Sequence, residues 1–95
     1  MKKYEVMYIV NSALEDAKRQ ETIETLSGII TSNGGNVTKV DDWGIKEYAY
    51  EIEKAKKGHY VVVEFEASNE ALKEFDRLIH INSNVVRYMI VSKED

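Results

Sequence analysis

The sequence predicts an α+β protein with a ferredoxin-like split β-α-β sandwich, in which four antiparallel strands form one sheet and two helices cover one of its faces. Three observations lead to this prediction. Four segments have the composition or alternation of strands, two have the apolar spacing of helices, and their order is strand, helix, strand, strand, helix, strand. With strands numbered along the chain, we expect the sheet order 4-1-3-2. The 95 residues form one domain, residues 1–95, without a repeat or a linker.

The first third of the chain predicts a strand followed by a helix. Residues 3–10 are rich in β-branched and aromatic side chains, which favour a largely buried strand. Ser12 and Glu15 have the spacing of a capping box, which predicts that the helix begins near them. Asn33-Gly34-Gly35 supplies the left-handed residues that commonly end a helix. Between these signals the positions expected to face the sheet recur at helical spacing: Arg19, Ile23, Leu26 and Ile30.

The middle of the chain predicts a long hairpin. Residues 36–52 alternate imperfectly around Gly44, so we expect one extended strand with an internal bend or bulge. Residues 53–58 are polar and lysine-rich and predict a turn. Residues 60–67 alternate with period two, which is typical of a third strand with one buried face.

The last third predicts a second helix and a fourth strand. Ser68 is a favourable N-cap, and the residues after it repeat as one apolar stripe. Residues 85–91 then form the fourth strand. The stripe consists of Leu72, Phe75, Leu78 and Ile79.

Composition excludes several classes of function. Without cysteine there is no disulfide, no thiolate metal site and no cysteine nucleophile. His59 and His80 each lack a second ligand at metal-binding spacing, so we predict no metal and no cofactor. No apolar run approaches the roughly 20 residues of a membrane helix, and we expect a cytoplasmic protein without a membrane partner.

The sequence also lacks the groups that catalysis on this fold requires. A phosphate cradle after the first strand would need glycines or an arginine, and residues 11–13 supply neither. Gly34 and Gly35 end a helix, whereas a nucleotide loop begins one. Asp41 and Asp42 are neighbours in a strand and point to opposite faces, so we interpret them as solvated carboxylates beside the bend. We predict no enzymatic activity and no small-molecule substrate.

For binding RNA, the placement of charged residues along this chain matters more than its net charge. A net charge of −4 argues against binding nucleic acid through a bulk basic surface. Two basic ends around an acidic middle fit a protein that touches the RNA backbone at its edges, although a solvated charge run is an equally open interpretation for the hairpin lysines. One end carries Lys2, Lys3, Lys39 and Lys93, and the other carries Lys54, Lys56 and Lys57.

The sheet face without helices predicts a protein contact more than base stacking. If Tyr4 and Tyr8 face the helices, Tyr60 is the only aromatic residue of the central strands that could stack a base, and nearby carboxylates repel phosphate. Apolar side chains on the same face suggest a surface partly covered by another protein, although each alone could be an isolated surface residue. The predicted partner surface consists of Met7, Ile9, Tyr60, Val62 and Met89.

Several segments have a specific order that covers the whole chain. They are Tyr4-Glu5, Asp41-Asp42-Trp43-Gly44 with Lys46, Ala49-Tyr50-x-Ile52-x-Lys54, Gly58-His59-Tyr60, residues 72–78, Asn82 and Val86-Arg87-x-Met89-Ile90-Val91. This set resembles the bacterial small-subunit ribosomal protein six family. The resemblance implies a ribosomal protein that binds small-subunit ribosomal RNA in the central domain, jointly with small-subunit protein eighteen. The RNA-binding residues that it implies are Lys2, Lys3, Tyr4, Lys46, Tyr50, Lys54 and Arg87.

One alternative from another functional class remains on the same fold. A small regulatory, ligand-binding or dimerising module of the ACT type would share the topology. Such a module needs a glycine-bearing effector loop after the first strand, and residues 11–15 contain no glycine. Ribosomal particles that co-purify with the chain, instead of a metabolite or a second copy, would separate the two hypotheses.

Overall fold

The structure, a computed structural model, describes residues 1–52 and 55–93, and side chains are described for residues 1–44 and 58–93. The order of elements is the predicted one. The strands are β1 (Lys2–Asn11), β2 (Asn36–Ile52), β3 (Ala55–Ala67) and β4 (Val85–Ser92), and the helices are α1 (Asp16–Ser32) and α2 (Asn69–His80).

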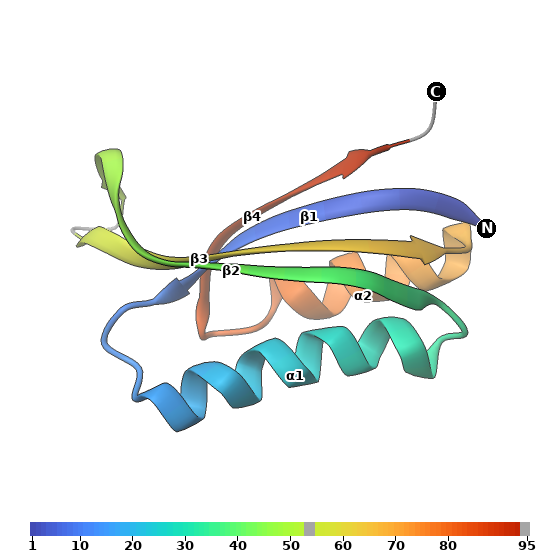
Figure 1. Ribbon diagram of the computed structural model, residues 1–95, viewed down its shortest axis with the longest axis horizontal. Coiled ribbons are helices and arrows are strands. Elements are labelled where there is room, and N and C mark those ends of the chain that lie inside the picture. Colours follow the sequence, from blue (N-terminus) through green and yellow to red (C-terminus); the bar gives the residue numbers. More distant parts are fainter. Residues whose placement is uncertain (53–54, 94–95) are drawn as a thin grey trace.

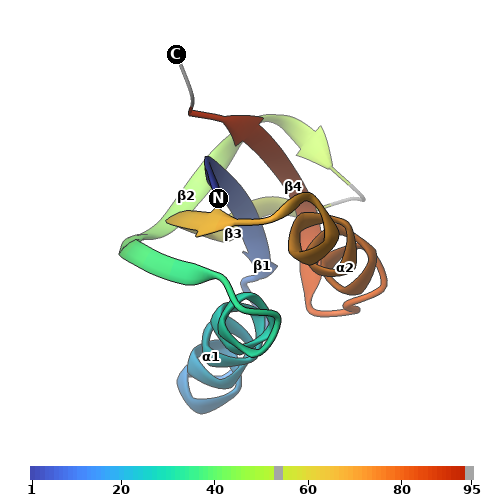
Figure 2. The same cartoon turned by 90° about the vertical axis from the view of Figure 1, so that its right-hand side faces the viewer.

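The four strands form one antiparallel sheet in the order β2-β3-β1-β4, which confirms the predicted order read from the other edge. β1 is central and pairs with β3 from Lys2 opposite Ala67 to Asn11 opposite Gly58. Both helices lie on the same side of the sheet (Figures 1 and 2). The opposite side, called here the open face, has no helix over it.

Period-two alternation in the strands builds the core between sheet and helices. On β1, Tyr4, Val6 and Tyr8 point toward the helices and are at most 7% exposed. The ring of Phe65 on β3 packs against the rings of Tyr4 and Phe75, with centroids 5.7 and 5.5 Å apart. The helices complete the core with Ile23, Leu26 and Ile30 from α1 and with Ala71, Phe75 and Ile79 from α2.

The start of α1 lies close to the predicted position, but its cap differs from the prediction. The capping box is wrong, because the helix begins at Asp16 and the side chain of Glu15 makes no capping hydrogen bond. Asn11 organises the connection instead: its Oδ1 accepts from the amide of Ala13 at 2.9 Å, and its carbonyl accepts from the amide of Leu14 at 3.2 Å. This local Asn turn ends β1 and delays the helix.

The N-cap of α2 is the predicted one. The Ser68 hydroxyl accepts from the amide of Ala71 at 3.2 Å. This bond satisfies one of the amides that a helix start leaves without an intrahelical partner.

The hairpin between β2 and β3 is longer than predicted. Part of the predicted turn is wrong, since β3 already begins at Ala55. Pairing runs to Glu47 opposite Lys57 and, after a break in register, is found again at Ile52 opposite Ala55. Cross-strand backbone hydrogen bonds outweigh the weak strand preference of the lysine-rich segment. β1 ends opposite Gly58, so beyond that point β2 and β3 continue as a two-stranded ribbon that bends away from the helix layer (Figure 1).

Candidate RNA and partner interface

The open face carries a continuous group of apolar side chains across three strands. Met7 lies opposite Val62 on β3 and Met89 on β4. Ile9 lies opposite Tyr60 on β3 and Arg87 on β4. The predicted partner residues are therefore neighbours in space. We define the open-face patch as Met7, Ile9, Tyr60, Val62 and Met89.

Close packing within the patch leaves its rim as the accessible part. Ile9 and Val62 are only 7% and 8% exposed although no helix covers them, because cross-strand neighbours bury them. Met89 is 54% exposed and Val91 is 39% exposed. Sequence reasoning missed Val91, which the alternation of β4 places on the same face as Met89.

A shallow groove runs along the β4 side of the open-face patch. It has a volume of about 220 Å³. Arg87 is exposed at this groove and is the predicted RNA-binding residue nearest to the patch. The residues that line the groove are Met7, Ile9, Arg87, Tyr88 and Met89.

The cations at the start of β1 lie among carboxylates. The amide of Lys93 donates to the carbonyl of Lys3 at 2.9 Å, so the ends of β1 and β4 are joined. The ammonium of Lys93 is 3.8 Å from the carboxylate of Glu5. Lys2 and Lys3 are both exposed. This end of the sheet therefore presents separate positive charges and no broad basic surface.

Tyr4, which was predicted to bind RNA together with Lys2 and Lys3, is buried, whereas the two lysines are exposed. It is 7% exposed, its ring packs against Phe65, and its hydroxyl donates to Oδ1 of Asn69 at 3.4 Å. Its observed contacts are with the core and the start of α2. An RNA contact by Tyr4 stays a prediction.

The remaining predicted RNA-binding residues belong to the hairpin. The backbone of Lys46 pairs with Gly58, at the point where β1 ends. Lys54 lies outside the described residues. The side chains of four further hairpin residues also lie outside them: Lys46, Tyr50, Lys56 and Lys57.

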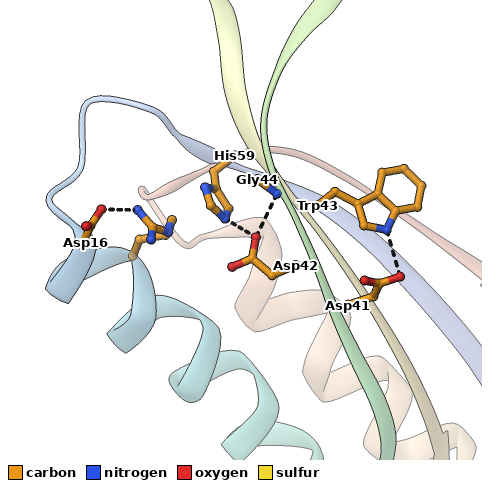
Figure 3. A network of polar contacts seen from close by, with 7 residues as sticks. Asp16, Asp41, Asp42, Trp43, Gly44 and His59 are labelled. Atoms are coloured by element: carbon orange, nitrogen blue, oxygen red, sulfur yellow. Dashed lines mark hydrogen bonds and ion pairs between the residues drawn. The ribbon is translucent and has the colours of Figure 1, made fainter.

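A network of polar contacts surrounds the bulge that β2 forms between Asp42 and Gly44 (Figure 3). Oδ1 of Asp42 accepts from the amide of Gly44 at 2.9 Å and from Nε2 of His59 on β3. Oδ2 of Asp41 accepts from the indole N–H of Trp43 at 3.0 Å. The two carboxylates point apart, as predicted. Asp42 is exposed, which agrees with the interpretation as solvated carboxylates, but each carboxylate also accepts a specific hydrogen bond. The reason is the bulge, which brings a backbone amide and an indole within reach.

His59 is the buried member of this network. It is 6% exposed, and among the described residues no hydrogen-bond partner meets its Nδ1. Nothing in the sequence predicted its pairing with Asp42. The two residues are 17 positions apart, and only the register across the bulge places them together.

Two tyrosines have altered acidity. Burial raises the pKa of Tyr8 above its usual range, and the nearby charge of Asp42 adds to the effect. The hydrogen bond that Tyr88 donates to Asp76, aided by burial, raises the pKa of Tyr88 to about 12. Both phenols are therefore neutral at physiological pH. Neither is placed as an acid or a base.

Among residues 1–44 and 58–93, whose side chains are described, no group of three or more His, Asp or Glu side chains could hold a metal ion. No helix in the described ranges is long and apolar enough to cross a membrane.

Comparison with known proteins identifies close relatives over the full chain. Residues 3–92 match the family model described as ribosomal protein S6. The chain is 43% identical to the small ribosomal subunit protein bS6 of Carboxydothermus hydrogenoformans, over 99% of this chain and 98% of that protein. It is also 43% identical to the bS6 protein of Halalkalibacterium halodurans, over the whole of both chains.

A solved structure supports the same fold. The crystal structure of 30S ribosomal protein S6 from Thermotoga maritima superposes with a TM-score of 0.92 at 26% identity, over 97% of this chain and 87% of that one. The match agrees with the ferredoxin-like arrangement described above. Together with the sequence relatives, it favours the ribosomal interpretation over a regulatory module.

Proposed function

The chain belongs to the ribosomal protein S6 family, and on this premise we propose that it binds small-subunit ribosomal RNA in the central domain together with small-subunit protein eighteen. It is a structural component of the small ribosomal subunit and of translation, and not an enzyme, as the sequence predicted. In this proposal its place is the cytoplasmic ribosome.

The observation that carries the proposal is the open-face patch. Apolar side chains gathered on one uncovered face are typical of an interaction surface. Glu5, Glu64 and Glu66 lie on the same face. Carboxylates repel RNA phosphates, whereas a basic protein partner can pair with them. The partner protein therefore covers the patch, and RNA contacts occur around it.

The RNA contacts come from cations at the two ends of the sheet and from Arg87 on β4. Lys2 and Lys3 supply them at the start of β1, and Arg87 supplies one at the groove beside the patch. Tyr4 supports the end of the sheet that carries Lys2 and Lys3, because its hydrogen bond to Asn69 anchors β1. The hairpin contributes its own set at the opposite end: Lys46, Tyr50 and Lys54.

Few phosphate contacts imply weak binding by the chain alone. Each neutralised phosphate adds about 0.7 to 0.9 units to the slope of log affinity against log salt. With a net charge of −4, the chain has no basic excess to add to these contacts. Affinity must therefore come from shared binding with the partner.

A salt titration of single variants tests the RNA contacts. Lys2→Ala, Lys3→Ala and Arg87→Ala should each reduce the salt slope of assembly on central-domain RNA by about one unit. None should unfold the protein, because exposed charges contribute little to stability.

The matched controls are Lys18→Ala and Lys73→Ala, which remove exposed lysines from the helix layer. Both should leave the slope unchanged. If the slope is unchanged for Arg87→Ala alone, Arg87 does not contact phosphate and serves only to neutralise the carboxylates of the open face. Unchanged slopes for all three test variants contradict binding through the ends of the sheet.

A further inference from the structure

The hairpin leaves the body of the sheet at the bulge in β2. Asp42 lies opposite Val61 and Gly44 lies opposite Tyr60, so Trp43 is one extra residue on β2. Gly44 has a φ of +79°, in the left-handed region that favours glycine. A bulge of this kind increases the local twist and changes the direction of the strand. We call residues 45–52 and 55–58, which continue beyond it, the hairpin arm.

The hairpin arm lacks the support that the rest of the sheet has. β1 ends opposite Gly58, so beyond the pair of Lys46 and Gly58 the arm has no third strand beside it. A two-stranded ribbon is marginally stable by itself, and its direction depends on what holds its base. The base is where Asp42 and His59 meet.

Asp42 joins the bulge to the neighbouring strand through one oxygen. Its Oδ1 accepts from the amide of Gly44, which holds the turn of the bulge, and from Nε2 of His59, which belongs to β3. His59 is itself fixed, because it is 6% exposed and its backbone lies opposite Val10 at the end of β1. Movement of the bulge relative to β3 therefore breaks at least one of these bonds.

We propose that Asp42 and His59 form a clamp that sets the direction of the hairpin arm and so positions its cations for RNA. The positioning of cations for RNA rests on the proposed function, whereas the direction of the hairpin arm concerns only the free protein. Both residues act as positioning residues and neither contacts RNA.

The direction in which one substitution changes RNA affinity distinguishes the clamp from a purely electrostatic effect. Asp42→Ala removes a negative charge, and electrostatics alone predicts tighter RNA binding. The clamp predicts weaker binding, by about five- to eightfold at 0.1 M salt if one phosphate contact is lost. Asp41→Ala is the matched control, because it removes the same charge at the next position and breaks only the bond to Trp43. It should bind as tightly as the parent or more tightly.

The orientation of the arm is measured directly in the free protein. Residual dipolar couplings of backbone amides in the arm, relative to those in β1, should change in Asp42→Ala and not in Asp41→Ala. Asp42→Asn keeps an oxygen that accepts both bonds and should restore the couplings. If Asp42→Ala does not fold, His59→Leu, which fills the buried site without a donor, gives the same readout.

A double-mutant cycle connects the arm to RNA. Lys46→Ala should lose most of its effect on RNA affinity in the Asp42→Ala background, whereas Lys3→Ala at the other end should keep its full effect. Unchanged couplings in Asp42→Ala overturn the clamp, whatever the RNA result. Changed couplings with unchanged RNA affinity overturn its role in binding. Failure of the parent to bind RNA even with its partner refutes the proposed function while the couplings still test the clamp.

Discussion

Met89 gives a quantitative test of the open-face patch. It is 54% exposed, so about half of its surface remains available to a partner. Full burial of a methionine side chain contributes about 1.5–3 kcal/mol, and burying the remaining half contributes roughly 0.8–1.6 kcal/mol. Replacing Met89 by Ala should therefore weaken assembly with the partner by about four- to fifteenfold.

Titration calorimetry of the chain with small-subunit protein eighteen and an RNA fragment measures this effect. Ile81→Ala is the control, because Ile81 is 65% exposed just past the end of α2, in the helix layer. Neither substitution should change the free energy of unfolding by more than about 0.5–1 kcal/mol, since both side chains are exposed. Unchanged affinity for Met89→Ala, or equal weakening by Ile81→Ala, would refute the assignment of the patch.

Three further predictions concern the fold. Phe75→Ala, at a side chain 1% exposed, should lower the free energy of unfolding by about 3–5 kcal/mol in chemical denaturation; a loss below about 1 kcal/mol would contradict its place in the core. Gly44→Ala should lower the free energy of unfolding by about 1–2 kcal/mol, because alanine is strained at a φ of +79°. Steric contact adds nothing, since no atom lies within 4 Å of the added carbon, and an unchanged free energy of unfolding would argue against the bulge. The raised pKa of Tyr88, about 12, predicts a stabilising effect that is complete below its ordinary pKa of 10 and lost as the pH rises toward 12. Tyr88→Phe should remove that part of the alkaline loss and one late-titrating phenol in ultraviolet absorbance, and an unchanged titration curve would count against the bond to Asp76.

The sequence predicted the elements and their faces because those depend on periodicity. Alternation along β1 placed Tyr4, Val6 and Tyr8 toward the helices, and burial in the structure agrees. Gly44 predicted the bulge because a glycine within a strand pattern allows a positive φ. The order of the elements then left few possible topologies.

The features that were wrong or missed depend on local competition or on register. Asn11 forms a turn that displaces the capping box, and both patterns are visible in the same few residues without indicating which prevails. The pairing of Asp42 with His59 requires the register across the bulge, which no sequence spacing encodes. Val62 and Ile9 were expected on the open face, but their deep burial comes from cross-strand packing.

Joint binding to ribosomal RNA is tested by titrating the RNA with each protein and with the pair. The affinity of a central-domain ribosomal RNA fragment is determined by titration at fixed salt for the chain alone, for small-subunit protein eighteen alone and for both together. With a net charge of −4 and few phosphate contacts, the chain alone should bind weakly, and the pair should bind at least about tenfold more tightly than either protein. Equal affinity of the isolated chain and the pair would contradict joint binding.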